Sequence, residues 1–162
     1  MKILKELIPY IVIIITVILI RSFLVTPIKV DGDSMYDTLK DGELMILNKI
    51  DKTLNGIDRY DIVVFNYEGE KLIKRVIGLP GEIISCENGK IYINGKSLGD
   101  KYGSNETSDF KQMKIPKGEY YVLGDNRNIS KDSRYIGTIK DKDIKGTTSL
   151  IIFPFTHIKS VD

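Results

Sequence analysis

Residues 88–95 read Asn-Gly-Lys-Ile-Tyr-Ile-Asn-Gly, and this octapeptide decides the class of the fold. An Asn-Gly pair is the combination that tight two-residue hairpin turns favour, because both of its residues tolerate positive φ. One such pair precedes the segment KIYI and another follows it, so the sequence predicts a short strand with a tight turn at each end. Strands joined by such turns pair in the antiparallel sense, since a parallel pair needs a long crossover connection.

Short runs of β-branched and aliphatic residues recur on both sides of this octapeptide and are separated by turn signals. Their spacing predicts a mainly β domain built from antiparallel sheets or a partly closed barrel, and it does not fit a parallel α/β sheet. The polar stretch Lys96–Lys114 is interpreted as a long loop. The predicted strands are Ile28–Val30, Leu44–Leu47, Ile62–Tyr67, Leu72–Ile77, Ile83–Ser85, Lys90–Ile93, Glu119–Leu123 and Ser149–Phe153.

The N-terminal region has a different composition. From Leu7 to Val25 the chain reads LIPYIVIIITVILIRSFLV, with no charged residue between Tyr10 and Ile20. About 20 apolar helical residues cross a hydrocarbon core, so this segment is predicted to be a transmembrane helix if Arg21 extends its charge to the interface. A cleaved signal peptide is disfavoured, because it would require a small-x-small site after the apolar run, and Thr26-Pro27 follows instead. A buried core helix is also disfavoured, because it would be apolar on one stripe only and this segment is apolar all round.

Lys2 and Lys5 precede the apolar segment, and the positive-inside rule therefore keeps the N-terminus in the cytoplasm. We expect residues 1–26 to form the cytoplasmic N-terminus and a single-pass anchor in the cell membrane. Residues 27–162 are then expected to form one extracellular domain, and this length suits one compact unit.

Charge and composition exclude several classes of function. The formal net charge is +2, which gives no electrostatic case for binding nucleic acid. The single cysteine, Cys86, excludes an intramolecular disulfide, and the single histidine, His157, excludes a multi-histidine metal site. We therefore expect no nucleic-acid partner, no metal and no cofactor.

Two polar residues in apolar surroundings are candidates for chemistry. Ser34 lies in the segment VDGDSMYDTL, where a serine beside glycine is by itself most often a turn residue. Lys74 lies within the strand-like segment KLIKRVIG, among apolar neighbours that would desolvate its amine and lower its pKa. A neutral lysine can act as general base towards a serine hydroxyl. Alternatively, Lys74 packs its stem at a sheet edge and keeps its amine in water.

A third segment, Tyr121–Gly137, follows an apolar strand and contains acids, arginines and serines at high density. Such density is usual for a solvated loop, but alternating Asp and Arg residues can also build a buried ion-pair scaffold beneath a site. The composition alone does not choose between the two.

Taken in order, these segments resemble type I signal peptidases of the small Gram-positive kind. The resemblance runs from the anchor to about Gly146 and depends on four ordered motifs, which are Ser34-Met35, Arg59–Phe65, Lys74–Gly81 and Gly124–Arg134. It implies a membrane-tethered Ser-Lys endopeptidase with a β-rich catalytic domain on the outer face. Members of that family remove signal peptides from exported preproteins.

The resemblance also implies roles for individual residues. Ser34 would be the nucleophile and Lys74 the general base, while Ser130 would orient the lysine by a hydrogen bond. The backbone N–H of Ser34 would contribute to the oxyanion hole. The residues that would hold the framework of the site are Asp125, Arg127, Asp132 and Arg134.

The chain departs from the family pattern in three places. Gly32 stands where some relatives provide a second oxyanion donor from a side-chain hydroxyl. Asp37 stands where the family usually has proline, and Glu82 stands where it usually has aspartate. The loss of a fixed φ at residue 37 is expected to loosen the turn behind Ser34 without abolishing activity.

The resemblance implies preprotein substrates with small residues at the first and third positions before the cut. The candidates for lining the corresponding pockets are Ile28, Val30, Leu72 and Ile73. Membrane lipid is a further expected partner, and the protein-export machinery is a candidate one.

Three other functions compete with this interpretation. A catalytically silent signal-peptidase-like factor that assists assembly of surface proteins typically lacks the dyad, whereas Ser34 and Lys74 are both present here. A self-cleaving Ser-Lys repressor needs a DNA-binding helical domain in place of the anchor. A tethered binding domain would require four ordered motifs to arise by chance.

Overall fold

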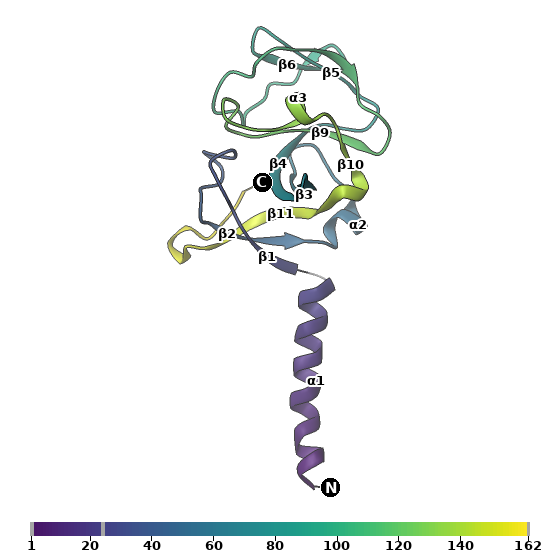
Figure 1. Ribbon diagram of the computed structural model, residues 1–162, viewed down its shortest axis with the longest axis vertical. Helices are drawn as coiled ribbons and strands as arrows, with labels where there is room; N and C mark the ends of the chain where they lie inside the picture. The colour runs from purple at the N-terminus through teal and green to yellow at the C-terminus, as the bar shows by residue number, and fades with distance from the viewer. Residues whose placement is uncertain (1, 24, 162) are drawn as a thin grey trace.

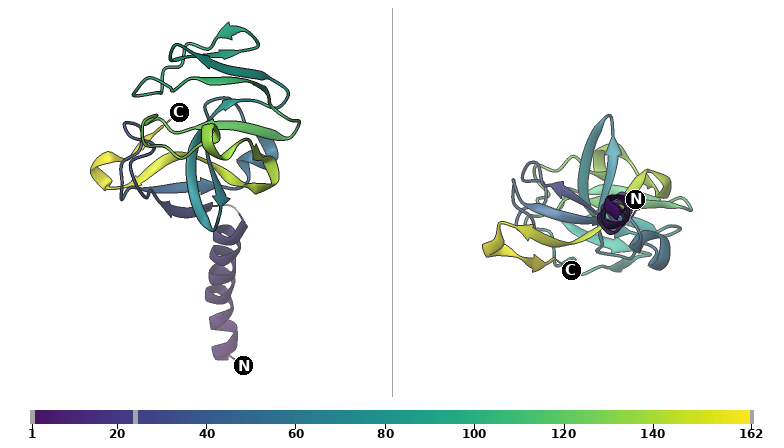
Figure 2. Two further views of the ribbon diagram at one scale, coloured as in Figure 1. Left: turned by 45° about the horizontal axis from the view of Figure 1, so that its top comes forward. Right: turned by 90° about the horizontal axis from the view of Figure 1, so that it is seen from below.

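The computed structural model describes residues 2–23 and 25–161, without the side chains of residues 2–5, 18–23, 25 and 51. The chain forms one long helix followed by a β-rich body, and the smaller of two sheets lies at the end of that body farthest from the helix (Figures 1 and 2). The helix α1 spans Lys2–Phe23, and the next element along the chain is the first strand, β1 (Val25–Lys29).

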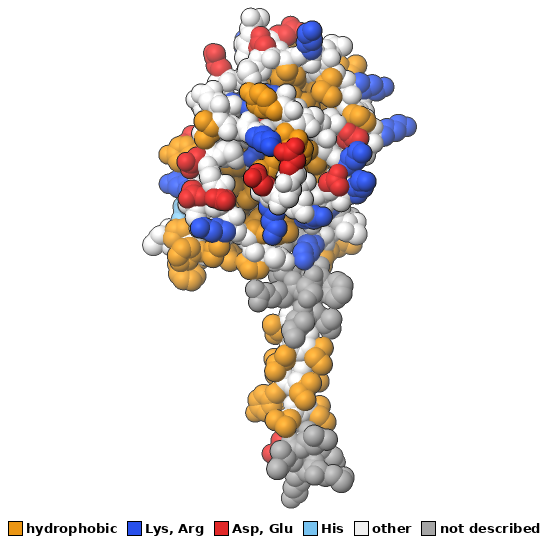
Figure 3. Space-filling model, viewed as in Figure 1, with side chains coloured by type: hydrophobic (Ala, Val, Ile, Leu, Met, Phe, Trp, Pro, Cys, Tyr) orange, Lys and Arg blue, Asp and Glu red, His pale blue; other side chains and the backbone are white. Residues whose placement is uncertain are grey.

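The described side chains of α1 are exposed on every side. The large apolar residues between Leu7 and Val17 have exposed fractions of 47–65%, and α1 extends away from the body as an isolated apolar stalk (Figure 3). Over the described part of the chain, no helix combines the length and the apolar character of a membrane span. The side chains of Lys2, Lys5 and Arg21, which entered the topology prediction, lie outside the described residues.

The body consists of two antiparallel sheets, as the sequence predicts. The larger has eight strands in the order β1-β2-β11-β3-β4-β9-β10 with β12 paired to β11, and the smaller has the order β7-β6-β5-β8. The strands after β1 are β2 (Leu44–Asn48), β3 (Ile62–Tyr67), β4 (Glu70–Gly78), β5 (Ile83–Glu87), β6 (Lys90–Ile93), β7 (Lys96–Ser97), β8 (Phe110–Lys114), β9 (Glu119–Leu123), β10 (Ile139–Lys140), β11 (Ile144–Phe153) and β12 (Lys159–Ser160). The helices after α1 are short, namely α2 (Asp51–Asn55), α3 (Ser133–Ile136) and the 3-10 turns η1 (Asp141–Asp143) and η2 (Phe155–His157).

The two Asn-Gly turns form as predicted. Asn88 and Gly89 have φ of 52° and 74° between β5 and β6, and Asn94 and Gly95 have φ of 51° and 77° between β6 and β7. Of the two predicted arrangements, antiparallel sheets are confirmed and the partly closed barrel is wrong. The larger sheet is open, because β1 and β10 are the two ends of its strand order among the described residues.

The interpretation of Lys96–Lys114 as a loop is also wrong at both ends of that stretch, where β7 and β8 form. Strand β8 pairs with β5 in a register that places Phe110 opposite Cys86 and Met113 opposite Ile84. The Phe110 ring also stacks on Tyr121, with centroids 5.1 Å apart. Two apolar side chains in a polar segment are therefore enough to place β8, because both cover the core between the two sheets.

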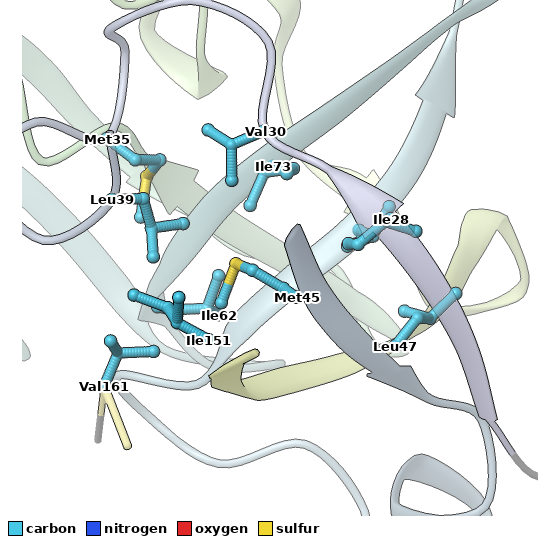
Figure 4. Packing of buried hydrophobic residues seen from close by; sticks show 11 residues of the cluster. Ile28, Val30, Met35, Leu39, Met45, Leu47, Ile62, Ile73, Ile151 and Val161 are labelled. Carbon is cyan, nitrogen blue, oxygen red and sulfur yellow. The ribbon is translucent and has the colours of Figure 1, made fainter. Parts of the chain in front are cut away.

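One hydrophobic cluster packs against the residues that follow β1, among them the neighbours of Ser34. Met35 and Leu39 are 1% and 0% exposed and pack with Ile28, Val30 and strand residues of β2, β3, β4 and β11 (Figure 4). These contacts fix a polar loop from below, and Ser34 is adjacent to the buried Met35. The position of the serine is therefore set by the hydrophobic core.

Candidate active site

Ser34 lies in a closed loop of residues 30–43, here called the serine loop. The loop closes where the Val30 N–H donates to the Glu43 carbonyl at 2.8 Å and the Gly42 N–H donates to the Val30 carbonyl at 3.0 Å. Gly32 has φ +79°, a conformation that glycine adopts without strain, and its N–H donates to Asp41 Oδ1 at 2.9 Å. Ser34 is half-buried in this loop.

Lys74 comes from the middle of β4 and is only 2% exposed. Its Nζ lies 2.7 Å from Ser34 Oγ and 2.8 Å from the carbonyl oxygen of Ile73. Burial lowers the pKa of the Lys74 amine to about 8, an effect that the negative charges of Asp132 and Asp125 oppose. Lys74 is thus not a sheet-edge residue with its amine in water, because the amine is buried beside a hydroxyl.

Asp125 follows β9 and forms a fully buried ion pair with Arg75, the residue after Lys74. Arg75 Nε lies 2.9 Å from Asp125 Oδ1, Arg75 Nη2 lies 2.8 Å from Asp125 Oδ2, and both side chains are 0% exposed. The Tyr102 ring covers the guanidinium at 3.7 Å. This bidentate geometry is the strong form of a charge-assisted contact, and it ties the strand of Lys74 to the chain that follows β9.

Asp132 and Arg134 form a second pair. Arg134 Nε and Nη2 each lie 2.9 Å from an Asp132 oxygen, and Asp132 Oδ2 also accepts from the Gly124 N–H at 3.0 Å. Arg127 is 2% exposed; its Nε donates to the Gly124 carbonyl at 2.8 Å, and its other nitrogens contact Thr107 and Asp100. The segment after β9 is therefore a buried ion-pair scaffold and not a solvated loop.

Ser130 differs from its expected arrangement. It is 2% exposed, but its Oγ has no hydrogen-bond partner among the described residues, so the expected hydrogen bond to Lys74 is absent here. Ser130 nevertheless lies close to the site through Gly124. A Cβ at Gly124 would lie 2.2 Å from Ser130 Oγ and 2.5 Å from the Ser34 carbonyl oxygen, so the glycine allows all three residues to approach.

A cleft of about 300 Å³ opens beside Ser34 and Lys74. Its walls come from β1 and the residues after it on one side and from β4 on the other. All four residues predicted to contact substrate line it, and their role stays a prediction. The lining residues are Pro27, Ile28, Lys29, Val30, Asp31, Ser34, Met35, Val64, Lys71, Leu72, Ile73 and Lys74.

Comparisons with known proteins identify the family of the chain. A family model described as "Signal peptidase, peptidase S26" matches residues 3–153. The chain is 42% identical to a Signal peptidase I of Bacillus amyloliquefaciens, a match that covers 88% of this chain and 81% of the relative. It is 40% identical to Signal peptidase I T of Bacillus subtilis strain 168, with 90% and 83% covered. The chain belongs to the type I signal peptidase family.

A solved structure supports the same assignment. The crystal structure of a signal peptidase I from Enterococcus faecalis V583 matches with a TM-score of 0.51 and 38% identity, covering 56% of this chain and 95% of that one. As a member of the type I signal peptidase family, the chain is a hydrolase that cleaves peptide bonds.

The three residues that depart from the family pattern, Gly32, Asp37 and Glu82, have different surroundings in the structure. Glu82 accepts from the Leu79 N–H at 2.7 Å and pairs with Arg59 Nη2 at 2.5 Å, so it joins two of the four motifs. Asp37 is exposed on the serine loop. Gly32 supplies no side-chain hydroxyl, so the Ser34 N–H is the oxyanion donor that the resemblance assigns within this loop.

Sequence reasoning missed the partners of the scaffold. Arg75 pairs with Asp125, and Thr38 of the serine loop donates from its hydroxyl to Asp125 Oδ2 at 2.5 Å. Asp100, which pairs with Arg127, lies in the polar stretch interpreted as a loop. The available signal for Arg75 was its charge beside Lys74 in a strand segment whose other residues, Leu72, Ile73, Val76 and Ile77, are apolar, because a buried arginine requires an anion nearby.

The scaffold generates the first prediction. Replacing Asp125 by Asn leaves Arg75 as a buried charge without its counter-ion, and we expect the free energy of unfolding to fall by about 3–5 kcal/mol. Urea unfolding of the full chain in detergent measures this loss. The control is Glu68→Gln, which breaks the exposed Lys131–Glu68 pair and is expected to leave the unfolding curve unchanged. Equal stability of wild type and Asp125→Asn would contradict the assignment of Asp125 as the buried counter-ion of Arg75.

Proposed function

We propose that the chain is a membrane-bound serine endopeptidase that removes N-terminal signal peptides from exported preproteins, with Ser34 as nucleophile and Lys74 as general base. The observation that carries the proposal is the 2.7 Å contact between Ser34 Oγ and a lysine amine that burial holds at a lowered pKa. The names of the relatives support the substrate class.

The proposed reaction begins with Lys74 in its neutral form. With a pKa of about 8, about one tenth of the molecules carry the neutral amine at pH 7. Lys74 Nζ accepts the Ser34 hydroxyl proton as Oγ attacks the scissile carbonyl, and the Ser34 N–H donates to the oxyanion. The lysine then gives that proton to the leaving amine, and an ester remains on Ser34. Water, deprotonated by Lys74, hydrolyses the ester and restores Ser34.

The proposed substrate lies extended in the cleft between β1 and β4. The β1 edge is unpaired on one side among the described strands, so its backbone groups are available to an added strand. Ile28, Val30 and Ile73 are 8%, 2% and 9% exposed and form an apolar floor. A shallow apolar floor of this kind suits small substrate side chains at the first and third positions before the cut.

We further propose that α1 associates with the cell membrane, with its N-terminus cytoplasmic and the β body extracellular. Apolar side chains from Leu7 to Val17 are exposed around the whole helix, which is unfavourable in water and favourable in lipid. The strand β1 is the next element after α1 and also lines the cleft, so the anchor holds the site close to the membrane, where the export machinery delivers preproteins. A silent assembly factor is not favoured, because the serine and the buried lysine lie in contact.

The second prediction concerns the proposed dyad of Ser34 and Lys74. Ser34→Ala and Lys74→Ala are each expected to lower the rate of preprotein cleavage by about 10⁴-fold or more, because each removes a group that the chemistry requires. The assay is cleavage of a membrane-reconstituted preprotein, with the new N-terminus of the product sequenced. Ser97→Ala and Lys96→Ala, on the exposed strand β7, are matched controls and are expected to retain full activity.

Two results would contradict the proposal. One is wild-type cutting that persists in either dyad variant, and the other is cutting at sites without small residues at the first and third positions. Folded wild-type protein that cuts no preprotein in lipid would instead support the silent assembly factor.

The third prediction concerns pH. Because Lys74 must be neutral to act as base, kcat/KM is expected to rise about tenfold per pH unit below its midpoint and to level off above it. The midpoint is expected near the Lys74 pKa of about 8. A profile that is flat between pH 6 and 9, or one still rising at pH 10, would show that no amine with a lowered pKa is the base.

A further inference from the structure

The Asp125 carboxylate contacts both segments that carry the dyad, the serine loop and β4. Asp125 Oδ1 and Oδ2 accept from Arg75, which follows Lys74 on β4. Asp125 Oδ2 also accepts from the Thr38 hydroxyl at 2.5 Å, and Thr38 follows Ser34 by four residues in the serine loop. Arg75 Nη2 further donates to Thr38 Oγ1 at 3.3 Å, so the three side chains form a closed set of contacts.

This arrangement runs alongside the dyad itself. Ser34 and Thr38 belong to the serine loop, and Lys74 and Arg75 belong to β4. The Ser34–Lys74 contact and the Thr38–Arg75 contact therefore both connect the serine loop to β4. Asp125 is 0% exposed, and its bidentate contact with Arg75 leaves it little freedom to move. A hydroxyl bonded to such a fixed acceptor restrains the segment that carries it.

Two longer hydrogen bonds also connect the serine loop to the rest of the body. The Ser34 carbonyl accepts from the Asn126 N–H at 3.1 Å, and the Tyr36 carbonyl accepts from the Ser104 hydroxyl at 3.3 Å. Residue 37 is an exposed aspartate, which does not fix φ as a proline would. Thr38 therefore adds a short polar contact to the packing of Met35 and Leu39, which holds the serine loop against the core.

We propose that Thr38 is a positioning residue for the nucleophile: its hydroxyl fastens the serine loop to the Asp125–Arg75 pair and so holds Ser34 Oγ within reach of Lys74 Nζ. The inference rests on the proposed function, because it assigns a role within that reaction. Thr38 is not among the residues that line the cleft, and its hydroxyl contacts Asp125 and Arg75.

The test compares Thr38→Val, which keeps the shape and removes the hydroxyl, with Thr38→Ser, which keeps the hydroxyl. Because a displacement of about 1 Å costs about 100-fold in rate, Thr38→Val is expected to lower kcat by about 10- to 100-fold. KM is expected to stay within about twofold, since the residues lining the cleft are unchanged. Thr38→Ser is expected to return kcat to within about threefold of wild type, because its hydroxyl reaches the same acceptor.

The pH profile separates this role from an effect on the base. Lys74 stays buried in Thr38→Val, so the midpoint of the kcat/KM profile is expected to match that of wild type. The control is Thr148→Val on β11, which removes another buried threonine hydroxyl, one without a partner among the described residues. It is expected to retain wild-type kcat. Thermal unfolding of each variant confirms that it is folded at the assay temperature.

The inference is overturned if folded Thr38→Val has wild-type kcat, if Thr38→Ser is as impaired as Thr38→Val, or if the loss appears in KM alone. Wild type and Ser34→Ala are measured in the same assay. A wild-type protein that cuts no preprotein would overturn the proposed function and this inference with it. Wild-type cutting with an unimpaired Thr38→Val would overturn the inference alone.

Discussion

The Nζ atom of Lys74 lies 2.7 Å from Ser34 Oγ on a side chain that is 2% exposed, and the removal of this amine from water is the constraint on which the site depends. An ammonium group is costly to bury, so burial favours the neutral amine and lowers its pKa. Lys74 lies in β4, which is flanked by β3 and β9, so the interior of the larger sheet supplies this burial. Fold and chemistry are thus coupled, because the strand position that buries Lys74 also makes a neutral amine accessible at moderate pH.

The two buried carboxylates near Lys74 act in the opposite direction, since their charges raise its pKa. Each carboxylate is already engaged elsewhere: Asp125 with Arg75 and Thr38, and Asp132 with Arg134 and the Gly124 N–H. Because these partners neutralise and orient the acids, the acids can shape the site without forming an ion pair with the lysine. The scaffold therefore gives rigidity while desolvation keeps the larger effect on Lys74.

Local signals in the sequence located eight of the strands and the two Asn-Gly turns, because turn geometry depends on neighbouring residues, but they missed β7, β8, β10 and β12. Local signals made Ser34 and Lys74 candidates only, and the family resemblance paired these two residues, which are 40 residues apart and in contact. The Arg75–Asp125 pair, the contact of Thr38 with Asp125 and the pairing of β8 with β5 were not foreseen. Each joins segments distant in the chain, and only tertiary packing determines which distant residues meet. The expected hydrogen bond between Ser130 and Lys74 came from resemblance, and the described geometry does not contain it.

The most direct test of this account is the pKa of the Lys74 amine in the folded protein. Lysine labelled with ¹³C at Cε gives NMR signals whose shifts follow protonation, and the signal missing from Lys74→Met identifies the residue. A midpoint at about pH 8, well below the ordinary 10.5, is expected for the buried amine. A midpoint at the ordinary value would mean that the amine is solvated and charged, and would contradict the assignment of Lys74 as a buried general base.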